Sequence, residues 1–242
     1  MSFRVAQAQR DETVTIGGSV ENPWTALPAS APFVLPSDVT AVTAFNDRRA
    51  VSDCTRLQLG PLPEPFIGRP DAPIVLLRAG PGFTPDDIRF TEHHGAREVW
   101  WRNVVHQPLE YPFYPLDPAL AWAEHAMWWR RKLRQVLARF DERTVASNLL
   151  SIGAVPYHAY RYLGASPVLP SQRYSLELVE RAVDREALIL MSNTVRFWLD
   201  AVPLLHGYPH LHIARVARGG HITPGYYPEG FAHLERVLRA CS

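Results

Sequence analysis

Four short apolar segments, separated by stretches with the spacing of amphipathic helices, constrain the fold more than any other feature of this chain. Each apolar segment has the length of a buried strand. The predicted strands are residues 74–77, 148–155, 187–191 and 211–216, and the main predicted helices are residues 120–140, 172–185, 193–205 and 231–239. Strands that alternate with helices form parallel sheets covered on both faces. We therefore expect an α/β fold with three layers, αβα, around a central four-stranded, mostly parallel sheet.

The N-terminal part of the chain is rich in proline and cannot form a long helix. Prolines recur from residue 23 to residue 70, and each one removes a backbone donor and restricts the residue before it. One short helix is predicted there, at residues 39–45. Aromatic side chains are expected to attach this segment to the rest of the protein: Trp24, Phe33, Phe45 and Phe66. We expect an arm of residues 1–70 wrapped on a body of residues 71–242, together one globular unit.

Composition and motifs exclude several classes of protein. A hydrophobic share of 47% with 20% charged residues is typical of a globular protein, and the net charge of +1 does not by itself indicate a nucleic-acid partner. Cys54 and Cys241 cannot form a Cys-x-x-Cys site, and the sequence contains no His-Glu-x-x-His or Gly-x-Ser-x-Gly motif. We expect no metal and no cofactor. Because there is no apolar run of about 18 residues and no signal-peptide core, we expect a cytoplasmic protein without a membrane partner.

The first predicted strand opens into a glycine-rich corner, Ala79-Gly80-Pro81-Gly82-Phe83, and two carboxylates, Asp86 and Asp87, follow it. Glycine lets a backbone approach a ligand closely. Ligands of parallel α/β sheets bind beyond the carboxyl ends of the strands. The corner is therefore the predicted active site. The alternative is that the two aspartates only cap the helix that begins there.

Three strand–turn segments resemble the motifs of the uracil-DNA glycosylase superfamily. The first motif, Gly-x-Asn-Pro-Gly or a relative, is matched by residues 78–82, and a middle strand that ends in a proline-containing segment is matched by residues 148–158. The last motif falls on residues 215–225, after the fourth strand. The resemblance covers about residues 60–240 and includes the order of the elements. It implies a monofunctional DNA glycosylase, which extrudes a nucleotide from DNA and hydrolyses the bond between base and sugar.

The chain departs from the superfamily pattern at the positions that carry the chemistry. Gly80 stands where many members have an Asn or Asp that positions the attacking water, and residues 216–218 stand where a His or Asn is usual. Some branches of the superfamily use a carboxylate elsewhere. The predicted catalytic residues are therefore Asp86, Asp87 and His221. A carboxylate would stabilise the oxocarbenium-like sugar, and the histidine would donate to the departing base.

The resemblance also implies which residues contact base and DNA. The predicted base contacts are Gly80, Pro81, Gly82, Phe83, Asn148, Tyr157 and His158. The stacking residue is Phe83 or, alternatively, Phe90. The predicted DNA contacts are Arg218, Gly219 and Gly220 at a phosphate, Tyr226 or Tyr227 as a wedge, and Arg130 and Arg131 along the backbone. Each of these side chains also has an ordinary structural explanation in packing, hydrogen bonding or a solvated surface.

Gly82 bears on the substrate, because members that act on uracil place a tyrosine there against C5 of the base. Glycine removes that obstacle. The expected substrate is a pyrimidine enlarged at C5, such as glucosylated 5-hydroxymethylcytosine in phage DNA, and the expected role is defence by a monomeric enzyme. Two alternatives stay open at this point. One is a uracil-DNA glycosylase for base-excision repair, and the other is a catalytically inactive DNA-binding protein with the same fold.

Overall fold

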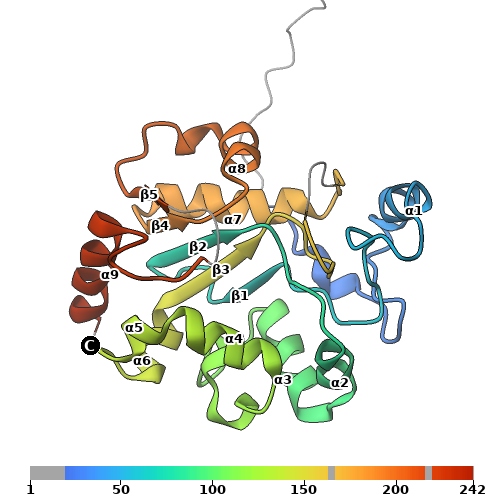
Figure 1. The fold of residues 1–242 in the computed structure, drawn as a ribbon, viewed down its shortest axis with the longest axis horizontal. Coiled ribbons are helices and arrows are strands. Elements are labelled where there is room, and N and C mark those ends of the chain that lie inside the picture. The colour runs from blue at the N-terminus through green and yellow to red at the C-terminus, as the bar shows by residue number, and fades with distance from the viewer. Residues whose placement is uncertain (1–19, 163–166, 216–219, 242) are drawn as a thin grey trace, which may run out of the picture.

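A computed structural model describes residues 20–162, 167–215 and 220–241 and shows a mixed five-stranded sheet between helices (Figure 1). The strands are β1 (Phe66–Gly68), β2 (Ile74–Arg78), β3 (Leu149–Gly153), β4 (Leu188–Met191) and β5 (Leu211–Ile213). Their order in the sheet is β1-β3-β2-β4-β5. Strand β1 is antiparallel to β3, whereas the other neighbouring pairs are parallel.

The predicted α/β class is confirmed, but the sheet has one strand more than the sequence led us to expect. The four predicted segments correspond to β2, β3, β4 and β5. Strand β1 comes from the proline-rich segment and lies at the edge of the sheet. Its three residues follow Pro63 and Pro65, and proline is tolerated next to an edge strand because one side of that strand needs no ladder partner.

The helices are α1 (Val39–Asp47), α2 (Asp86–Glu92), α3 (His94–Val104), α4 (Glu124–Lys132), α5 (Arg134–Leu137), α6 (Glu142–Asn148), α7 (Gln172–Asp184), α8 (Val195–Ala201) and α9 (Pro228–Ala240). Four of the five predicted helices correspond to helices of the structure, namely α1, α7, α8 and α9, and the fifth needs a correction. Residues 98–105, whose sequence does not decide between strand and helix, lie mainly in α3. The single helix predicted at 120–140 is wrong. Leu133 leaves helical geometry (φ −90°, ψ 4°) with its side chain fully buried and separates α4 from α5.

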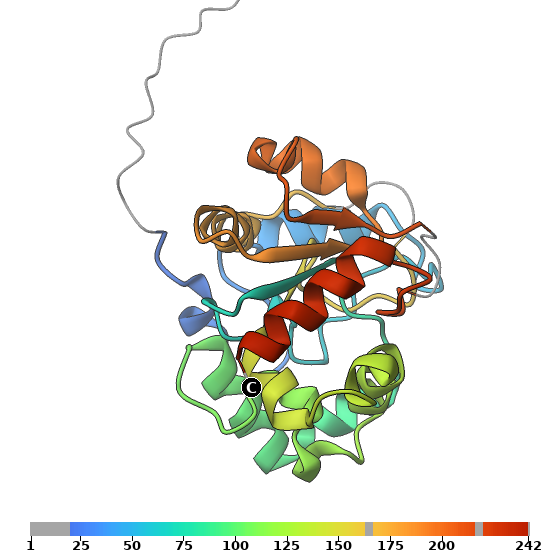
Figure 2. The same cartoon turned by 90° about the vertical axis from the view of Figure 1, so that its left-hand side faces the viewer.

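Helices cover both faces of the sheet and make three layers (Figures 1 and 2). Helices α7 and α8 lie on one face, and α2 to α6 lie on the other, where α9 also packs beside α6. Every residue of β2, β3 and β4 is buried. These strands are therefore almost continuously apolar, as parallel strands covered on both faces are.

The proline-rich segment packs firmly against the rest of the protein. Trp24, Phe33 and Phe66 are buried. The buried carboxylate of Asp38 accepts hydrogen bonds from the hydroxyl of Tyr157 (2.7 Å) and from the backbone N–H of Ser171 (3.0 Å). Because a buried carboxylate needs such donors, these bonds fix the proline-rich segment to the chain after β3 and to the start of α7.

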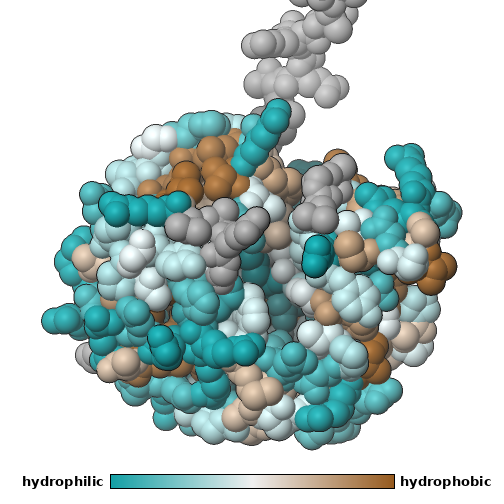
Figure 3. Space-filling model, in the orientation of Figure 1, coloured by the Kyte–Doolittle hydropathy of each residue, from teal (hydrophilic) through white to brown (hydrophobic). Residues whose placement is uncertain are grey.

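The surface around this core is mixed in polarity, with apolar patches separated by charged and polar side chains (Figure 3). None of the helices in the described ranges combines the length and the apolar composition needed to cross a lipid bilayer.

Candidate active site

The glycine-rich corner after β2 is held by the chain that follows β3. Pairing between the two strands continues beyond their ends. The hydrogen bonds run from the N–H of Ala154 to the carbonyl of Arg78 (3.0 Å), from the N–H of Val155 to the carbonyl of Ala79 (2.8 Å), and from the hydroxyl of Tyr162 to the carbonyl of Pro81 (2.7 Å). Three backbone carbonyls at and before the corner are thus fixed, so its backbone is preorganised at the edge of the sheet.

The two glycines of the corner have different reasons to be glycine. A Cβ atom on Gly80 would lie 2.5 Å from the carbonyl oxygen of Val155 and 2.7 Å from the ring of Tyr162. Gly80 is therefore required by packing within the protein, and not by approach to a ligand. A Cβ atom on Gly82 would meet no atom within 4 Å. Gly82 is exposed and leaves open space in front of the corner.

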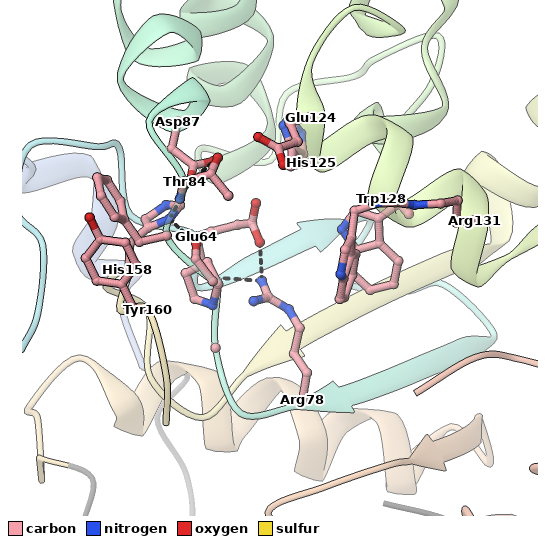
Figure 4. A pocket seen from close by; sticks show the side chains of 15 residues that line it. Glu64, Arg78, Thr84, Asp87, Glu124, His125, Trp128, Arg131, His158 and Tyr160 are labelled. Carbon is pink, nitrogen blue, oxygen red and sulfur yellow. Dashed lines mark hydrogen bonds and ion pairs between the residues drawn. The ribbon is translucent and has the colours of Figure 1, made fainter. Parts of the chain in front are cut away.

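A pocket of about 300 Å³ opens beside this corner, at the carboxyl end of β2. The molecular surface is hollowed on this face (Figure 3), and Figure 4 shows the side chains that surround the hollow. The lining residues are Glu64, Arg78, Gly80, Pro81, Gly82, Phe83, Thr84, Asp87, Glu124, His125, Trp128, Trp129, Arg131, His158 and Tyr160. Its volume is at the lower end of the range for small-ligand sites.

Asp87 and His158 form a buried charged pair in the wall of the pocket. The Nδ1 atom of His158 lies 2.7 Å from the carbonyl oxygen of Gly82, and its Nε2 atom lies 3.0 Å from that of Leu62. Because carbonyl oxygens only accept hydrogen bonds, both ring nitrogens must carry protons, and the ring is an imidazolium. The carboxylate of Asp87 lies 3.5 Å from Nδ1 and also accepts a bond from the N–H of Thr84 (2.7 Å).

The pKa values of this pair shift in opposite directions. Burial lowers the pKa of His158, but the hydrogen bond and charge of Asp87 outweigh it, and the net pKa is raised. Burial raises the pKa of Asp87, but His158 and the Thr84 N–H outweigh it, and the net pKa is lowered. Asp87 is therefore ionised at neutral pH, beside a cation that the fold holds in place.

A second buried ion pair joins Glu64 to Arg78, the last residue of β2. The Nη2 atom of Arg78 donates to the Glu64 carboxylate (2.6 Å) and to the Glu64 carbonyl (3.0 Å), and its Nε atom donates to the hydroxyl of Ser151 (3.0 Å). The two side chains are only 10% and 12% exposed. Figure 4 shows the Glu64 carboxylate directed into the pocket, with Arg78 beside it.

Helix α4 supplies the opposite wall with His125 and Trp128. The ring of His125 packs edge-on against Phe90 (4.7 Å between centroids), and its Nε2 atom is buried with no hydrogen-bond partner in the part of the chain that the structure describes. Burial lowers the pKa of His125, so the ring is neutral at pH 7. The indole of Trp128 is 40% exposed. Across from it, Phe83 and Tyr160 contact each other edge to face at 4.9 Å.

Seven of the predicted site residues come together in this pocket, namely Gly80, Pro81, Gly82, Phe83, Asp87, Arg131 and His158. Asp86 does not line it. Its carboxylate accepts a hydrogen bond from the N–H of Glu124 (2.7 Å) and contacts Arg89, so it caps α4. Asp86 therefore has a structural role, but its side chain caps α4 and not α2, the helix named in the capping alternative. The first turn of α2 directs the side chains of Asp86 and Asp87 to different sides.

Two of the predicted base contacts lie elsewhere. Asn148 precedes β3 and donates to the carbonyl of Thr144 (2.8 Å), which places it at the amino edge of the parallel strands. Asn148 cannot contact a base in the pocket, because the pocket is at the opposite, carboxyl edge of these strands. Tyr157 is buried, and its hydroxyl bonds Asp38, so that it serves packing and not base contact.

The predicted residues of the last motif do not reach the pocket. His221 is exposed and lies against Tyr226 (6.1 Å between ring centroids), so it is not beside Asp87. Tyr227 is buried and Gly220 packs close by, and both line a neighbouring cavity. A buried tyrosine is not available as a wedge. Arg218 and Gly219 lie outside the described residues.

The two arginines predicted to contact the DNA backbone, Arg130 and Arg131, lie on different surfaces. Arg130 pairs with Glu142 and donates to the carbonyl of Leu116 (3.0 Å), whereas Arg131 lines the pocket. Consecutive residues of a helix point about 100° apart, so the two guanidinium groups serve different surfaces.

Sequence reasoning missed much of the charge and the aromatic wall of the pocket. The missed residues are Glu64, Arg78, Thr84, Glu124, His125, Trp128, Trp129 and Tyr160. One signal was present in the sequence. Arg78 ends a buried apolar strand, and a buried guanidinium requires a carboxylate partner. The partner, Glu64, lies in the proline-rich segment and could not be identified from spacing.

No protein-family model, curated protein or solved structure matches this chain. Within the described ranges, no group of three or more His, Cys, Asp or Glu side chains is placed to hold a metal ion.

Proposed function

We propose that this protein is a DNA glycosylase, a divergent member of the uracil-DNA glycosylase superfamily, which excises a modified pyrimidine from an extruded nucleotide and leaves an abasic site. The observation that supports this most strongly is the pocket at the carboxyl end of β2. It combines a preorganised glycine corner with Glu64, Asp87 and His125. The predicted sequence motifs led to the same corner.

The pocket has the parts that bind a planar base. Phe83 and Tyr160 form one aromatic wall, and the half-exposed indole of Trp128 forms another. Aromatic faces stack on any base at about 1–3 kcal/mol each. The open space in front of Gly82 supports a base enlarged at C5, because no side chain of the corner fills that position.

The polar residues suit the charges that develop when the glycosidic bond breaks. The sugar becomes cationic, and the base departs as an anion. Glu64, directed into the pocket, would hold the attacking water, and ionised Asp87 would stabilise the sugar cation. Neutral His125 would donate a hydrogen bond to the base. These groups are fixed before the substrate arrives, which is the condition for electrostatic stabilisation of a transition state.

DNA would approach at the mouth of the pocket, where Arg131 and Trp128 are exposed. Arg131 would contact a phosphate, and phosphate contacts position a protein on DNA without reading its sequence. A defence role against phage DNA with heavily modified pyrimidines fits the open space at Gly82. The absence of the usual polar side chain at Gly80 favours a second candidate, a DNA-binding protein without activity.

Base release from synthetic duplexes tests the proposal. We expect alkaline cleavage after incubation with duplexes that contain glucosylated 5-hydroxymethylcytosine or 5-hydroxymethyluracil, and less cleavage with uracil. Glu64→Gln and Asp87→Asn should each lower the single-turnover rate by about 10²- to 10⁴-fold. The control is Asp71→Asn, at an exposed carboxylate that does not line the pocket.

Three results would contradict the proposal or refine it. Fast release of uracil alone would show a repair enzyme and end the idea of an enlarged substrate. Binding to modified or abasic DNA without release of any base would show the inactive binding protein. Equal rates for the wild type and both pocket variants would remove the assigned chemistry.

A further inference from the structure

A second cavity adjoins the pocket and contains the only lysine of the chain. It has a volume of about 90 Å³ and shares four lining residues with the pocket, Arg78, Gly80, Trp128 and Trp129. The other polar residues of its lining are Lys132, Ser192, Asn193 and Tyr227. It therefore continues the carboxyl edge of the sheet from β2 to β4.

Lys132 is held at this place from several sides. Its Nζ atom lies 4.1 Å from the centroid of the Trp128 ring. On the other side it lies so close to Gly220 that a Cβ atom there would be 2.7 Å away. The backbone carbonyl of Lys132 accepts a bond from Ile222 (3.0 Å). The amine therefore lies between an aromatic face and a glycine.

Every other lysine or arginine position of the chain is occupied by arginine. Lysine and arginine together number 25, and Lys132 is the single lysine, so 24 are arginine. Arginine can supply positive charge and bind phosphate, but its guanidinium group is not a nucleophile at ordinary pH. The one chemical property that lysine adds is a primary amine able to attack a carbonyl carbon.

Burial changes the state of this amine. It lowers the pKa of Lys132 from its ordinary 10.5 to about 8, so that about a fifth of the amine is neutral near pH 7.5. Among the residues that the structure describes, the other charged or titratable groups of the cavity lining are Arg78, which pairs with Glu64, and Tyr227, whose pKa burial raises to about 12.

We propose that Lys132 forms an imine with the aldehyde of an abasic deoxyribose, which gives the protein a lyase activity on abasic DNA. The placement supports this, because the lysine cavity adjoins the pocket and shares Arg78, Gly80 and Trp128 with its lining. A sugar at the mouth of the pocket would therefore lie next to the lysine cavity. The inference rests on the proposed glycosylase function for its substrate, an abasic site.

The step balances without any co-reactant except water. The neutral amine adds to C1′ of the open-chain sugar, and loss of water gives the imine. Removal of a proton from C2′ to solvent then breaks the C3′–O bond, and the electron pair leaves with the 5′-phosphorylated strand. Water hydrolyses the imine, which regenerates Lys132 and releases an unsaturated aldehyde. The overall reaction is an elimination, so it needs no oxidant and no reductant.

Trapping with borohydride on preformed abasic DNA tests the inference. Borohydride reduces an imine to a stable amine, so the wild type should form a covalent complex with an abasic duplex and none with a duplex that carries tetrahydrofuran, which has no aldehyde. Peptide mapping should place the adduct on Lys132. The rate of trapping should rise with pH through a midpoint near 8, as the amine loses its proton.

Substitutions of Lys132 test whether its amine, and not another amine of the protein, forms the trapped adduct. Lys132→Arg and Lys132→Met should lower trapping at least about 100-fold, and thermal unfolding should show that at least one of them is folded. Lys132→Arg combined with Arg196→Lys moves the single lysine to an exposed position on α8 and should not restore trapping. No adduct with wild type, or an equal adduct in a folded Lys132 variant, would overturn the inference. Because the abasic site is made beforehand, failure of base release and failure of trapping are distinguishable.

Discussion

Two segments leave the carboxyl edge of the same parallel sheet, and they contribute very differently to the site. The corner at residues 79–84 follows β2 and opens into the pocket with Gly82, Phe83 and Thr84. The segment at residues 220–227 comes after β5 and turns Tyr227 into the protein interior, while His221 faces solvent. We expected catalytic residues on both.

The comparison shows that a segment can leave the carboxyl edge of the sheet without bringing its side chains into the pocket. The corner is paired with residues 154–159 along its length, and the buried cations Arg78 and His158 anchor it. In the second segment, Arg215 bonds Tyr226 and Ile222 bonds Lys132, so the chain folds back toward α4. Backbone pairing therefore decides which of the two segments forms the pocket wall.

The largest expected effect on the free energy of unfolding comes from removing the ion pair between Arg78 and Glu64, which holds the corner in place. Arg78→Met leaves the Glu64 carboxylate buried without its partner, and such a loss costs about 3–5 kcal/mol of unfolding free energy. Tyr227→Phe, in the second segment, removes only a neutral hydroxyl that bonds Ser192 and should cost about 1 kcal/mol. Urea unfolding of both variants measures the contrast. Equal losses would show that the two segments are anchored alike.

A smaller effect separates the two glycines of the corner. Gly80→Ala forces its new methyl group against the Val155 carbonyl and Tyr162 and should cost about 1–3 kcal/mol. Gly82→Ala meets no atom and should stay within about 0.5 kcal/mol of the wild type. Thermal and urea unfolding check both. A destabilised Gly82→Ala would mean that the space in front of Gly82 is not open.

The smallest effect is a dependence of stability on pH. The raised pKa of His158 contributes stability that is fully present below about pH 6.5 and is lost as pH rises through its folded pKa. The lowered pKa of Asp87 contributes stability that is present above about pH 3.9 and is lost as pH falls through its folded pKa. Both contributions are present together between these two values.

Urea unfolding at about pH 6 and about pH 9 measures this coupling. Wild type should lose stability over that interval, and Asp87→Asn should lose less, because the carboxylate that raises the His158 pKa is gone. A parallel decline in both proteins would show that the buried pair does not titrate as assigned. His221→Ala provides the comparison in the second segment, and its profile should match that of the wild type.

The sequence predicted most of the sheet because its parallel strands are buried on both faces and are therefore apolar along their whole length. Strand β1 was missed because three residues between prolines and a turn carry no periodic signal. The break at Leu133 was missed because neither proline nor glycine marks it. Helix α1 and the start of α7 were predicted closely, since proline or polar residues limit them.

Within the candidate site, the sequence predicted the part that is contiguous in the chain. Gly82, Phe83 and Asp87 lie within six residues of one another, and a single turn brings them together. Glu64 and His125 reach the pocket from other segments, through the burial of Arg78 and the packing of α4 on Phe90. Such contacts depend on tertiary packing, which spacing along one sequence does not contain.

Base release by matched variants tests the central claim most directly. On a duplex with a C5-enlarged pyrimidine, the single-turnover rate should fall by about 10²- to 10⁴-fold in Asp87→Asn and change less than about twofold in His221→Ala. That result would place the chemistry at the corner after β2. Loss of activity in His221→Ala, with Asp87→Asn unaffected, would contradict the account and move the active site to the segment after β5.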